Sequence, residues 1–316
     1  MSRAQREVWG ATMVELAASD PRIVVLDGDL ATSTKADTFA DAYPDRFFEI
    51  GIAEQNMVGM AFGLSTLGFR PWLSSFGVFF THRALDSVRM LLAQTDAPVR
   101  IAASYTGLLN GSSGKTHQDI EDLAIMRAMP GMTVIAPADA AEARAAMIWA
   151  ADHDGPVYLR LARDAVSDVF GDDHVFTPGA VLTLREGGDV TLVSTGVQTS
   201  RVLAAAELLA ADGVEAKVVH VPSIKPLDGG ALLETLRGDA PVITIEEHSV
   251  IGGLGGLVAE LVTSSDLGMR VTRLGLADGW SESAPNDFLL DKYGLSPVRV
   301  AEQVRAKLSV LAPVRS

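Results

Sequence analysis

The segment FFEIGIAEQNMVGMAFG, residues 47–63, decides the fold, because it runs from a short apolar strand into a helix that carries two glycines. It places one carboxylate, Glu54, at the start of that helix. A glutamate in the first turn of a helix is favoured by the helix dipole and is usually just solvated. Here the small residues Gly59 and Gly63 indicate a helix that packs closely on its neighbours, with Glu54 at the junction of strand and helix.

Outward from this segment, short apolar runs alternate with helical patterns, which indicates helices packed on a mostly parallel sheet. The expected strands are residues 23–26, 46–49, 70–74, 99–103, 133–135 and 157–161. The expected helices are residues 5–18, 53–66, 80–93, 120–129 and 140–152. Asp139 is a natural N-cap for the last of these helices, whose body is rich in alanine.

Between about residues 165 and 188 the periodicity fails, and the chain is rich in Asp, Gly and Pro. Alternation then resumes, with strands expected at 190–194, 215–220 and 242–246 and helices at 198–211, 229–237, 254–264 and 298–308. We therefore expect an α/β protein with two doubly wound domains. The first, residues 1–175, has a mostly parallel sheet, and the second, residues 176–316, is smaller.

The composition of the chain narrows the range of possible functions. The 316 residues suffice for two cores, and 48% hydrophobic with 21% charged residues is typical of a globular protein. A formal charge of −14 argues against nucleic-acid or membrane partners, although it does not exclude an anionic small substrate bound by a local arginine cluster. There are no cysteines, the N-terminus lacks a secretion signal, and no apolar run approaches the roughly 20 residues that span a bilayer. These features predict a cytoplasmic protein.

Several motifs occur in a characteristic order. They are GIAEQN (51–56), DGDLATST (27–34), SSFGVFFTHRALDSVR (74–89), GSSGKTHQDIEDLAIMRAMPGMTVIAPAD (111–139) and YLRLAR (158–163). Together they resemble the pyrimidine-binding domain of transketolases and 1-deoxyxylulose-5-phosphate synthases. Residues 189–260, with SIKPLD and EEHSVIGGLGG, resemble the C-terminal domain of the same family, so the resemblance covers nearly the whole chain.

The resemblance implies thiamine diphosphate chemistry. Glu54 would be catalytic, with its carboxyl group hydrogen-bonded to ring nitrogen N1′ of the cofactor's aminopyrimidine, in a site that excludes water. Phe76, Phe79 and His82 fall where the family encloses that ring, and aromatic stacking leaves the ring nitrogens free for Glu54. His82 stands where transketolases often have tyrosine. The acidic turn DGDL also places Asp29 among the implied cofactor-binding residues.

The resemblance also assigns substrate contacts. His117, in GKTHQ, matches a histidine that faces the substrate's hydroxyl and carbonyl oxygens, and imidazole can donate or accept near neutral pH. Residues at positions that hold the sugar's terminal phosphate are Arg163, Ser33 and Arg6. Two positions depart from the family: Ser113 replaces an aspartate that contacts the donor's C2 hydroxyl, and Tyr105 replaces a donor-contacting histidine. A changed donor or acceptor preference is therefore expected.

One part of the family's machinery is missing. Thiamine diphosphate is held through Mg²⁺ by a sequence resembling GDG followed by NN, and this chain has no asparagine pair after its DGDL turn. We therefore expect a split transketolase. A separate N-terminal subunit would carry the diphosphate and Mg²⁺ site, this chain would hold no metal, and two copies of each chain would form a heterotetramer. Alone, this subunit should be inactive.

Four functions stay open from the sequence. The leading one is transfer of a two-carbon ketol unit from a ketose, phosphorylated or not, to an aldehyde. The second is a synthase that decarboxylates pyruvate and condenses it with an aldehyde, which alone would release CO₂. The third is the β subunit of a 2-oxoacid dehydrogenase, and the fourth is a non-catalytic partner that has kept the domain. The run GGLGG (252–256) lacks the GxGxxG spacing and indicates a tight turn, at most a weak anion site.

Overall fold

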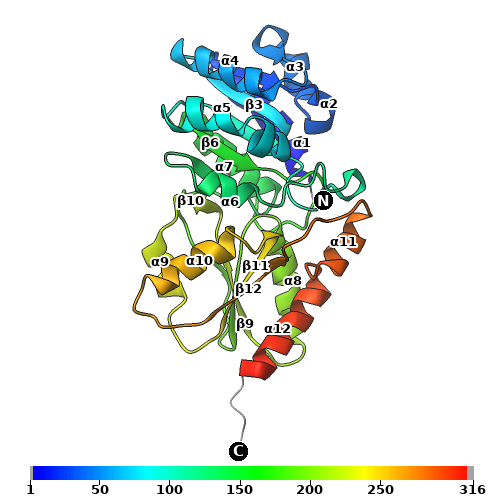
Figure 1. Ribbon diagram of the computed structural model, residues 1–316, viewed down its shortest axis with the longest axis vertical. Helices are drawn as coiled ribbons and strands as arrows, with labels where there is room; N and C mark the ends of the chain where they lie inside the picture. The colour runs from blue at the N-terminus through cyan, green and yellow to red at the C-terminus, as the bar shows by residue number, and fades with distance from the viewer. Residues whose placement is uncertain (1–2, 312–316) are drawn as a thin grey trace, which may run out of the picture.

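The computed structural model describes residues 3–311, which form two α/β units stacked along the long axis (Figure 1). Within this range the first sheet has seven strands in the order β10-β5-β6-β4-β3-β1-β2. These strands are β1 (Ile23–Asp27), β2 (Phe47–Glu49), β3 (Arg70–Phe76), β4 (Arg100–Ser104), β5 (Thr133–Ile135), β6 (Val157–Arg160) and β10 (Ser223–Lys225). In the same part of the chain, the second sheet has five strands in the order β12-β11-β8-β9-β7. They are β7 (Leu182–Arg185), β8 (Val190–Ser194), β9 (Ala216–His220), β11 (Val242–Ser249) and β12 (Val271–Leu276).

Both sheets are parallel apart from one strand each. The exceptions are β10, which is antiparallel to β5, and β7, which is antiparallel to β9. Strand β1, with the sequence IVVLD, is buried at every position, as expected for a central parallel strand covered on both faces. The predicted α/β fold, with two mostly parallel sheets, is confirmed.

Helices cover both faces of each sheet. In the first unit they are α1 (Gln5–Ser19), α2 (Ala31–Thr34), α3 (Asp37–Ala42), α4 (Glu54–Thr66), α5 (Leu85–Ser87), α6 (Asp122–Arg127) and α7 (Ala140–Asp152). In the second unit they are α8 (Gln198–Ala210), α9 (Gly229–Thr235), α10 (Leu254–Thr263), α11 (Asn286–Lys292) and α12 (Pro297–Leu311). Asp139 caps α7 as predicted, because its side chain accepts the Glu142 N–H at 2.9 Å.

The apolar core is continuous between the two units. One cluster, under α1 and α7, includes Trp9 and Met147. A second cluster lies under α4 and contains Met57 and Phe80, and it extends to Leu254 of α10 in the other unit. The two sheets are therefore held together by shared apolar contacts as well as by strand β10.

The segment predicted as one helix, 80–93, is irregular. It contains two π-helical stretches, Phe79–Arg83 and Val88–Ala93, on either side of α5. The Ala84 N–H donates to the Phe79 carbonyl at 2.9 Å, a bond that spans five residues. Such turns hold one extra residue, and they occur often at functional sites. Apolar periodicity alone could not reveal this change in helix type.

Three strands were missed by sequence reasoning. The segment 165–188 was expected to be irregular, but β7 lies within it. Strands β10 and β12 were also not predicted. All three are at sheet edges, where burial on one side only weakens the sequence pattern. The domain division at residues 175 and 176 stays a prediction, and β10 from beyond it joins the first sheet.

Candidate active site

The residues singled out in the first half of the sequence gather at one edge of the first sheet. Asp29 follows β1, Glu54 follows β2, Phe76 ends β3, Tyr105 follows β4 and Arg163 follows β6. Because these strands are parallel, their carboxyl ends meet at a single edge. Ligands of open α/β sheets bind at that edge.

Glu54 is the first residue of α4, and its side chain is fully buried. Both carboxylate oxygens lie 2.8 Å from Nη1 of Arg83. Arg83 comes from the first π-helical stretch and its side chain is 43% exposed, so it reaches from the buried Glu54 to the surface. The carboxylate is therefore away from water, and it already has a cationic partner that the sequence did not reveal.

An aromatic wall stands beside Glu54. The rings of Phe76 and Phe79 stack with centroids 5.9 Å apart, and Tyr105 stacks on Phe76 at 4.0 Å. His117 meets the two phenylalanine rings edge-on, at 5.9 and 5.6 Å. The structure thus brings four of the predicted residues into one cluster, and offset or edge-on packing of this kind is the favourable geometry for aromatic groups.

A basic cluster adjoins the aromatic wall. Arg6 Nη1 donates to the Tyr105 hydroxyl at 2.7 Å and to the Ser33 carbonyl at 2.9 Å. The guanidinium groups of Arg6 and Arg163 lie 5.6 and 5.5 Å from the Tyr105 ring centre. The neighbouring Tyr105 hydroxyl raises the pKa of Arg163, so that this side chain stays charged. Two guanidinium groups around one hydroxyl can bind a phosphate or sulfonate group.

The Asp29 turn is held in a special conformation. Its φ angle is +64°, in the left-handed region that residues other than glycine seldom adopt. Glu49 Oε1 fixes the turn by accepting the Asp29 N–H at 2.8 Å and the Gly51 N–H at 2.9 Å. The Asp29 side chain itself is exposed at the edge of the site.

The loop that carries Ser113 packs against the second unit. Ser113 Oγ donates to Asn110 Oδ1 at 2.7 Å, and the Ser283 hydroxyl donates to the Ser112 carbonyl at 2.7 Å. Ser113 is exposed, whereas His117 is half-buried against the aromatic wall. Of the two departures from the family pattern, Tyr105 lies within the cluster and Ser113 lies on the surface of its loop.

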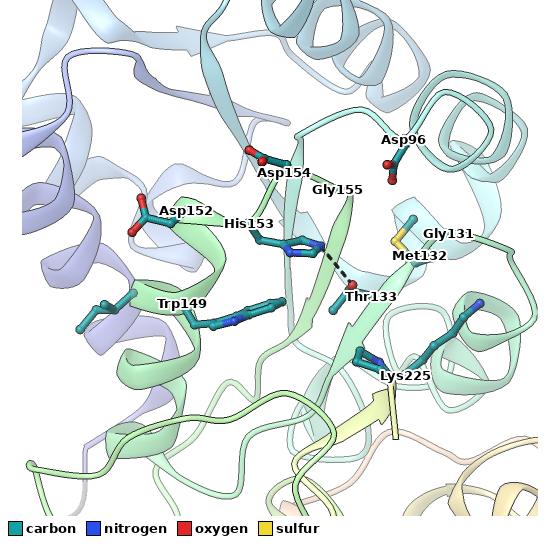
Figure 2. Close-up of a pocket in the computed structure, with 12 residues that line it drawn as sticks. Asp96, Gly131, Met132, Thr133, Trp149, Asp152, His153, Asp154, Gly155 and Lys225 are labelled. Carbon is teal, nitrogen blue, oxygen red and sulfur yellow. Dashed lines mark hydrogen bonds between the residues drawn. The ribbon is translucent and has the colours of Figure 1, made fainter. Parts of the chain in front are cut away.

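A hollow of about 860 Å³ lies at the opposite edge of the first sheet, where β5 and β6 begin (Figure 2). Trp149 stacks on His153 with ring centroids 4.6 Å apart, and Asp152 and Lys225 contribute charges to the lining. Burial lowers the pKa of His153. The hollow shares no residue with the cluster around Glu54, and it is at the amino ends of the strands.

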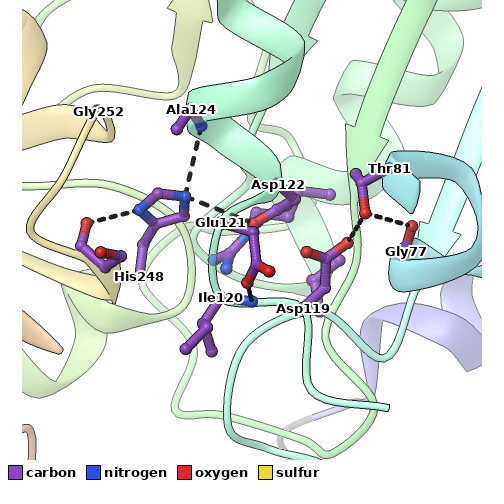
Figure 3. A network of polar contacts seen from close by, with 12 residues as sticks. Gly77, Thr81, Asp119, Ile120, Glu121, Asp122, Ala124, His248 and Gly252 are labelled. Carbon is purple, nitrogen blue, oxygen red and sulfur yellow. Dashed lines mark hydrogen bonds and ion pairs between the residues drawn. The ribbon is translucent and has the colours of Figure 1, made fainter. Parts of the chain in front are cut away.

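A hydrogen-bonded chain links His82 to the interior. Thr81 Oγ1 lies 2.8 Å from Asp119 Oδ2, as Figure 3 shows, and 2.9 Å from His82 Nδ1. His82 Nε2 lies 3.1 Å from Glu121 Oε1. Burial, together with the charge of Asp122, raises the pKa of Asp119 well above its usual value. Burial therefore favours the protonated form of this carboxyl group, which can donate to Thr81 Oγ1. His82 is fixed through both ring nitrogens.

Asp122 lies beside this chain. Its Oδ2 accepts from Arg160 Nε at 2.8 Å and from the Tyr158 hydroxyl at 3.0 Å. Figure 3 shows the link to the second unit, where His248 Nε2 accepts the Ala124 N–H at 3.4 Å. Nδ1 of His248 lies 2.7 Å from the Ser249 carbonyl. Burial lowers the pKa of His248, so the neutral ring with its proton on Nδ1 satisfies both contacts.

The GGLGG run opens helix α10, whose first N–H groups are already bonded. Glu246 accepts from Leu254 N at 2.6 Å and from Gly255 N at 2.8 Å. Burial raises the pKa of Glu246 to about 7. The weak anion site considered from the sequence is therefore filled by a side chain of the protein.

The donor set around Glu54 fits an aminopyrimidine. In the described part of the chain, the buried Ser75 hydroxyl has no hydrogen-bond partner. A Cβ added to Gly28 would lie 3.3 Å from that hydroxyl and 3.8 Å from Glu54 Cγ, so glycine keeps this approach open. A buried carboxyl, an unpaired hydroxyl and the face of Phe79 together suit a flat, polar ring.

Two further properties bear on the chemistry. Among residues 3–311, no cluster of three or more His, Cys, Asp or Glu side chains could hold a metal ion. Over the same residues, none of the helices is both long and apolar enough to cross a membrane.

Comparison with known proteins gives the class of protein to which this chain belongs. Residues 2–168 match the pyrimidine binding domain of transketolase, and residues 179–300 match the transketolase C-terminal domain. The fold and the site therefore define a pyrimidine-binding α/β protein with an appended C-terminal domain. The chain belongs to the transketolase family, which is thiamine diphosphate-dependent.

Several relatives are close to this chain in length. The transketolase C-terminal section of Methanocaldococcus jannaschii is 38% identical, with 97% of this chain and 96% of the relative covered. The 6-deoxy-6-sulfo-D-fructose transketolase subunit SqwH of Clostridium sp. is also 38% identical, with 95% and 94% covered. A solved structure, "Split gene transketolase, inactive beta4 tetramer", is 46% identical, with a TM-score of 0.89 and 97% and 98% covered. These similarities confirm the predicted relation to C-terminal sections of split transketolases.

Longer relatives match as well. The 1-deoxy-D-xylulose-5-phosphate synthase of Symbiobacterium thermophilum is 36% identical over 96% of this chain, which covers 46% of the synthase.

Proposed function

We propose that this chain is the C-terminal subunit of a two-chain transketolase that transfers a two-carbon ketol unit from a ketose to an aldehyde. The observation that carries the proposal is the single cluster at the carboxyl ends of the strands. It joins a buried carboxylate, Glu54, and an aromatic wall to the basic pair Arg6 and Arg163. One end suits a cofactor ring and the other suits an anionic sugar.

Thiamine diphosphate, when bound, supplies a reactive carbon that takes up the two-carbon unit. In this proposal Glu54 would hold a proton at N1′ of the pyrimidine. The aromatic residues Phe76 and Phe79, together with His82 and Asp29, would hold the pyrimidine ring. The buried position of Glu54 supports this role, because a water-free site strengthens the hydrogen bond of a carboxyl group.

The substrate contacts follow from the same cluster. His117 faces the sugar's oxygens, and Arg6, Ser33, Tyr105 and Arg163 bind its terminal anion. Phosphate is the expected anion by family analogy, while the name of the Clostridium relative refers to a sulfonated sugar. Guanidinium groups suit either one. Ser113 stays a candidate contact at the entrance.

The rest of the enzyme would come from a partner. We place the diphosphate and Mg²⁺ site on a separate N-terminal transketolase subunit, in a cytoplasmic heterotetramer with two copies of each chain. The 46% identical relative, a split-gene transketolase described as an inactive β4 tetramer, supports this division.

The test is reconstitution. The chain, an N-terminal transketolase subunit from the same organism, and their mixture are each supplied with thiamine diphosphate, Mg²⁺, a ketose phosphate and an aldehyde. The proposal expects ketol transfer by the mixture alone. Turnover by this chain by itself would contradict the split.

A second candidate is supported by the 36% identity to a deoxyxylulose-phosphate synthase. Such an enzyme would consume pyruvate. Release of CO₂ from pyruvate by the reconstituted mixture, without ketol transfer from a ketose, would favour it over the transketolase.

A further inference from the structure

Arg83 makes two contacts at once. Its Nη1 lies 2.8 Å from both oxygens of Glu54, and its guanidinium carbon lies 4.4 Å from the centre of the Phe79 ring. A planar cation therefore sits on an aromatic face while it donates to a buried carboxylate. The proposed cofactor ring would need the same carboxylate and the same aromatic face.

The two occupants also require different forms of the acid. A guanidinium has only donors, so it is satisfied by an ionised carboxylate. A ring nitrogen such as N1′ offers a lone pair, so it is satisfied by a carboxyl group that carries a proton. Arg83 Nη1 engages both oxygens of Glu54, so neither oxygen is free to carry a proton to a ring nitrogen while this contact lasts. Binding of the ring therefore requires Arg83 to give up at least one of them.

The protein can release Arg83 without unfolding the site. Arg83 ends the first π-helical stretch, and its main chain is anchored by Gln55 Nε2, which donates to its carbonyl at 2.9 Å. Only the partly exposed side chain has to move. It lines a cavity of about 330 Å³ with Glu121, whose carboxylate offers a second anionic partner.

We propose that Arg83 occupies the pyrimidine site of the cofactor-free chain, keeps the buried charge of Glu54 compensated, and must swing away when thiamine diphosphate binds. The inference rests on the proposed function. A buried carboxylate left without a partner is strongly destabilising, which explains why a chain with an empty site would retain such a group. The apparent cofactor affinity then equals the intrinsic affinity multiplied by the fraction of molecules in which Arg83 is released.

The experiment measures binding rather than turnover. Thiamine diphosphate with Mg²⁺ is titrated calorimetrically into the reconstituted two-chain enzyme carrying wild-type, Arg83→Met or Arg83→Lys chain. Methionine keeps the apolar stem on Phe79 without the charge, and lysine keeps the charge without the planar group. Arg89→Met is the matched control, because Arg89 is exposed on the same helical segment and does not contact Glu54.

The expected result is cofactor binding about tenfold tighter or more for Arg83→Met, an intermediate gain for Arg83→Lys and no change for Arg89→Met. The free Arg83→Met chain should also melt at a lower temperature than wild type, and added cofactor should raise its melting temperature more.

Equal or weaker binding by Arg83→Met would overturn the proposal and leave the transketolase assignment intact. Absence of binding by every assembly, wild type included, would overturn the proposed function and this inference with it. If Arg83→Met does not fold, the result with Arg83→Lys decides, and weaker binding by that variant overturns the proposal.

Discussion

Tyr105 lies parallel to Phe76, with ring centroids 4.0 Å apart and 18° between the ring planes. Its backbone φ is +62°, a region that is a true outlier for a bulky residue. Arg6 on its hydroxyl and Phe76 on its ring hold it in place. Strain of this kind persists only where the surroundings fix it, and it gathers at functional sites.

Tyr105→Phe tests this arrangement. The variant keeps the stacked ring but loses the hydroxyl that accepts from Arg6 at 2.7 Å. A hydrogen bond to a charged group is worth about 1.5–3 kcal/mol, so we expect KM for an anionic ketose to rise roughly 10- to 100-fold, with kcat less affected. Steady-state kinetics of the reconstituted enzyme give both values. Tyr43→Phe is the control, because the Tyr43 hydroxyl donates a long hydrogen bond, 3.5 Å, to the Val14 carbonyl. An unchanged KM would remove Tyr105 from the substrate site.

Glu142 joins the two units and should make stability depend on acid pH. It lies on α7, 2.8 Å from His220 Nε2 of β9 and 3.4 Å from His174 Nε2. Burial alone would raise the pKa of Glu142, but the charge of His220, the hydrogen bond to His220 and the nearby His174 outweigh burial and lower it to about 2. A carboxyl group whose pKa is lower in the folded chain than in the unfolded chain stabilises the fold at pH values above the unfolded pKa, here 4.5. This contribution is lost as the pH falls toward 2.

Glu142→Gln should therefore destabilise the chain most above pH 4.5, on the order of a few kcal/mol, and less as the pH falls. Denaturant unfolding at several pH values measures the difference from wild type. The control is Glu234→Gln, because Glu234 forms an exposed ion pair with Arg237 and its loss should have almost no effect on stability. If the stability difference between Glu142→Gln and wild type stayed constant across the acid range, Glu142 would not titrate as described.

Glu246 should make the stability of the fold depend on pH in the opposite direction from Glu142. Burial raises the pKa of Glu246 to about 7 from 4.5, so the folded chain binds this proton more tightly than the unfolded chain. Its contribution is fully present below pH 4.5 and is lost as the pH rises through about 7. The stability of Glu246→Gln should thus vary less with pH between these values than that of wild type. An equal dependence of stability on pH in the two proteins would refute the raised pKa of Glu246. The control is Glu302→Gln, because Glu302 is partly exposed on α12.

Sequence reasoning reached the fold because its central strands and longer helices carry strong patterns. Strand β1 is apolar throughout, and α7 begins at a recognisable cap. The pattern could not reveal β10, since three residues at an edge leave almost no periodicity, and their partner β5 is nearly 90 residues away. The same limit applies to the site.

The motifs selected Glu54, Phe76, Phe79, Tyr105 and His117, and the structure brings these residues together. Arg83 was missed although it lies inside a quoted motif, because its contact with Glu54 spans 29 residues and depends on a π turn. Ser75 and Glu121 were missed for a similar reason, since a hydroxyl or a carboxylate gains meaning only from its neighbours in space.

The most direct test of the account concerns the proton at Glu54. In the reconstituted enzyme with thiamine diphosphate bound, the rate of deuterium exchange at the cofactor's C2 carbon is measured for wild type and Glu54→Gln. We expect exchange to slow by about two orders of magnitude or more in the variant, the range for a positioned acid-base group, while the cofactor remains bound. Exchange at the wild-type rate in a fully loaded Glu54→Gln enzyme would contradict the central claim.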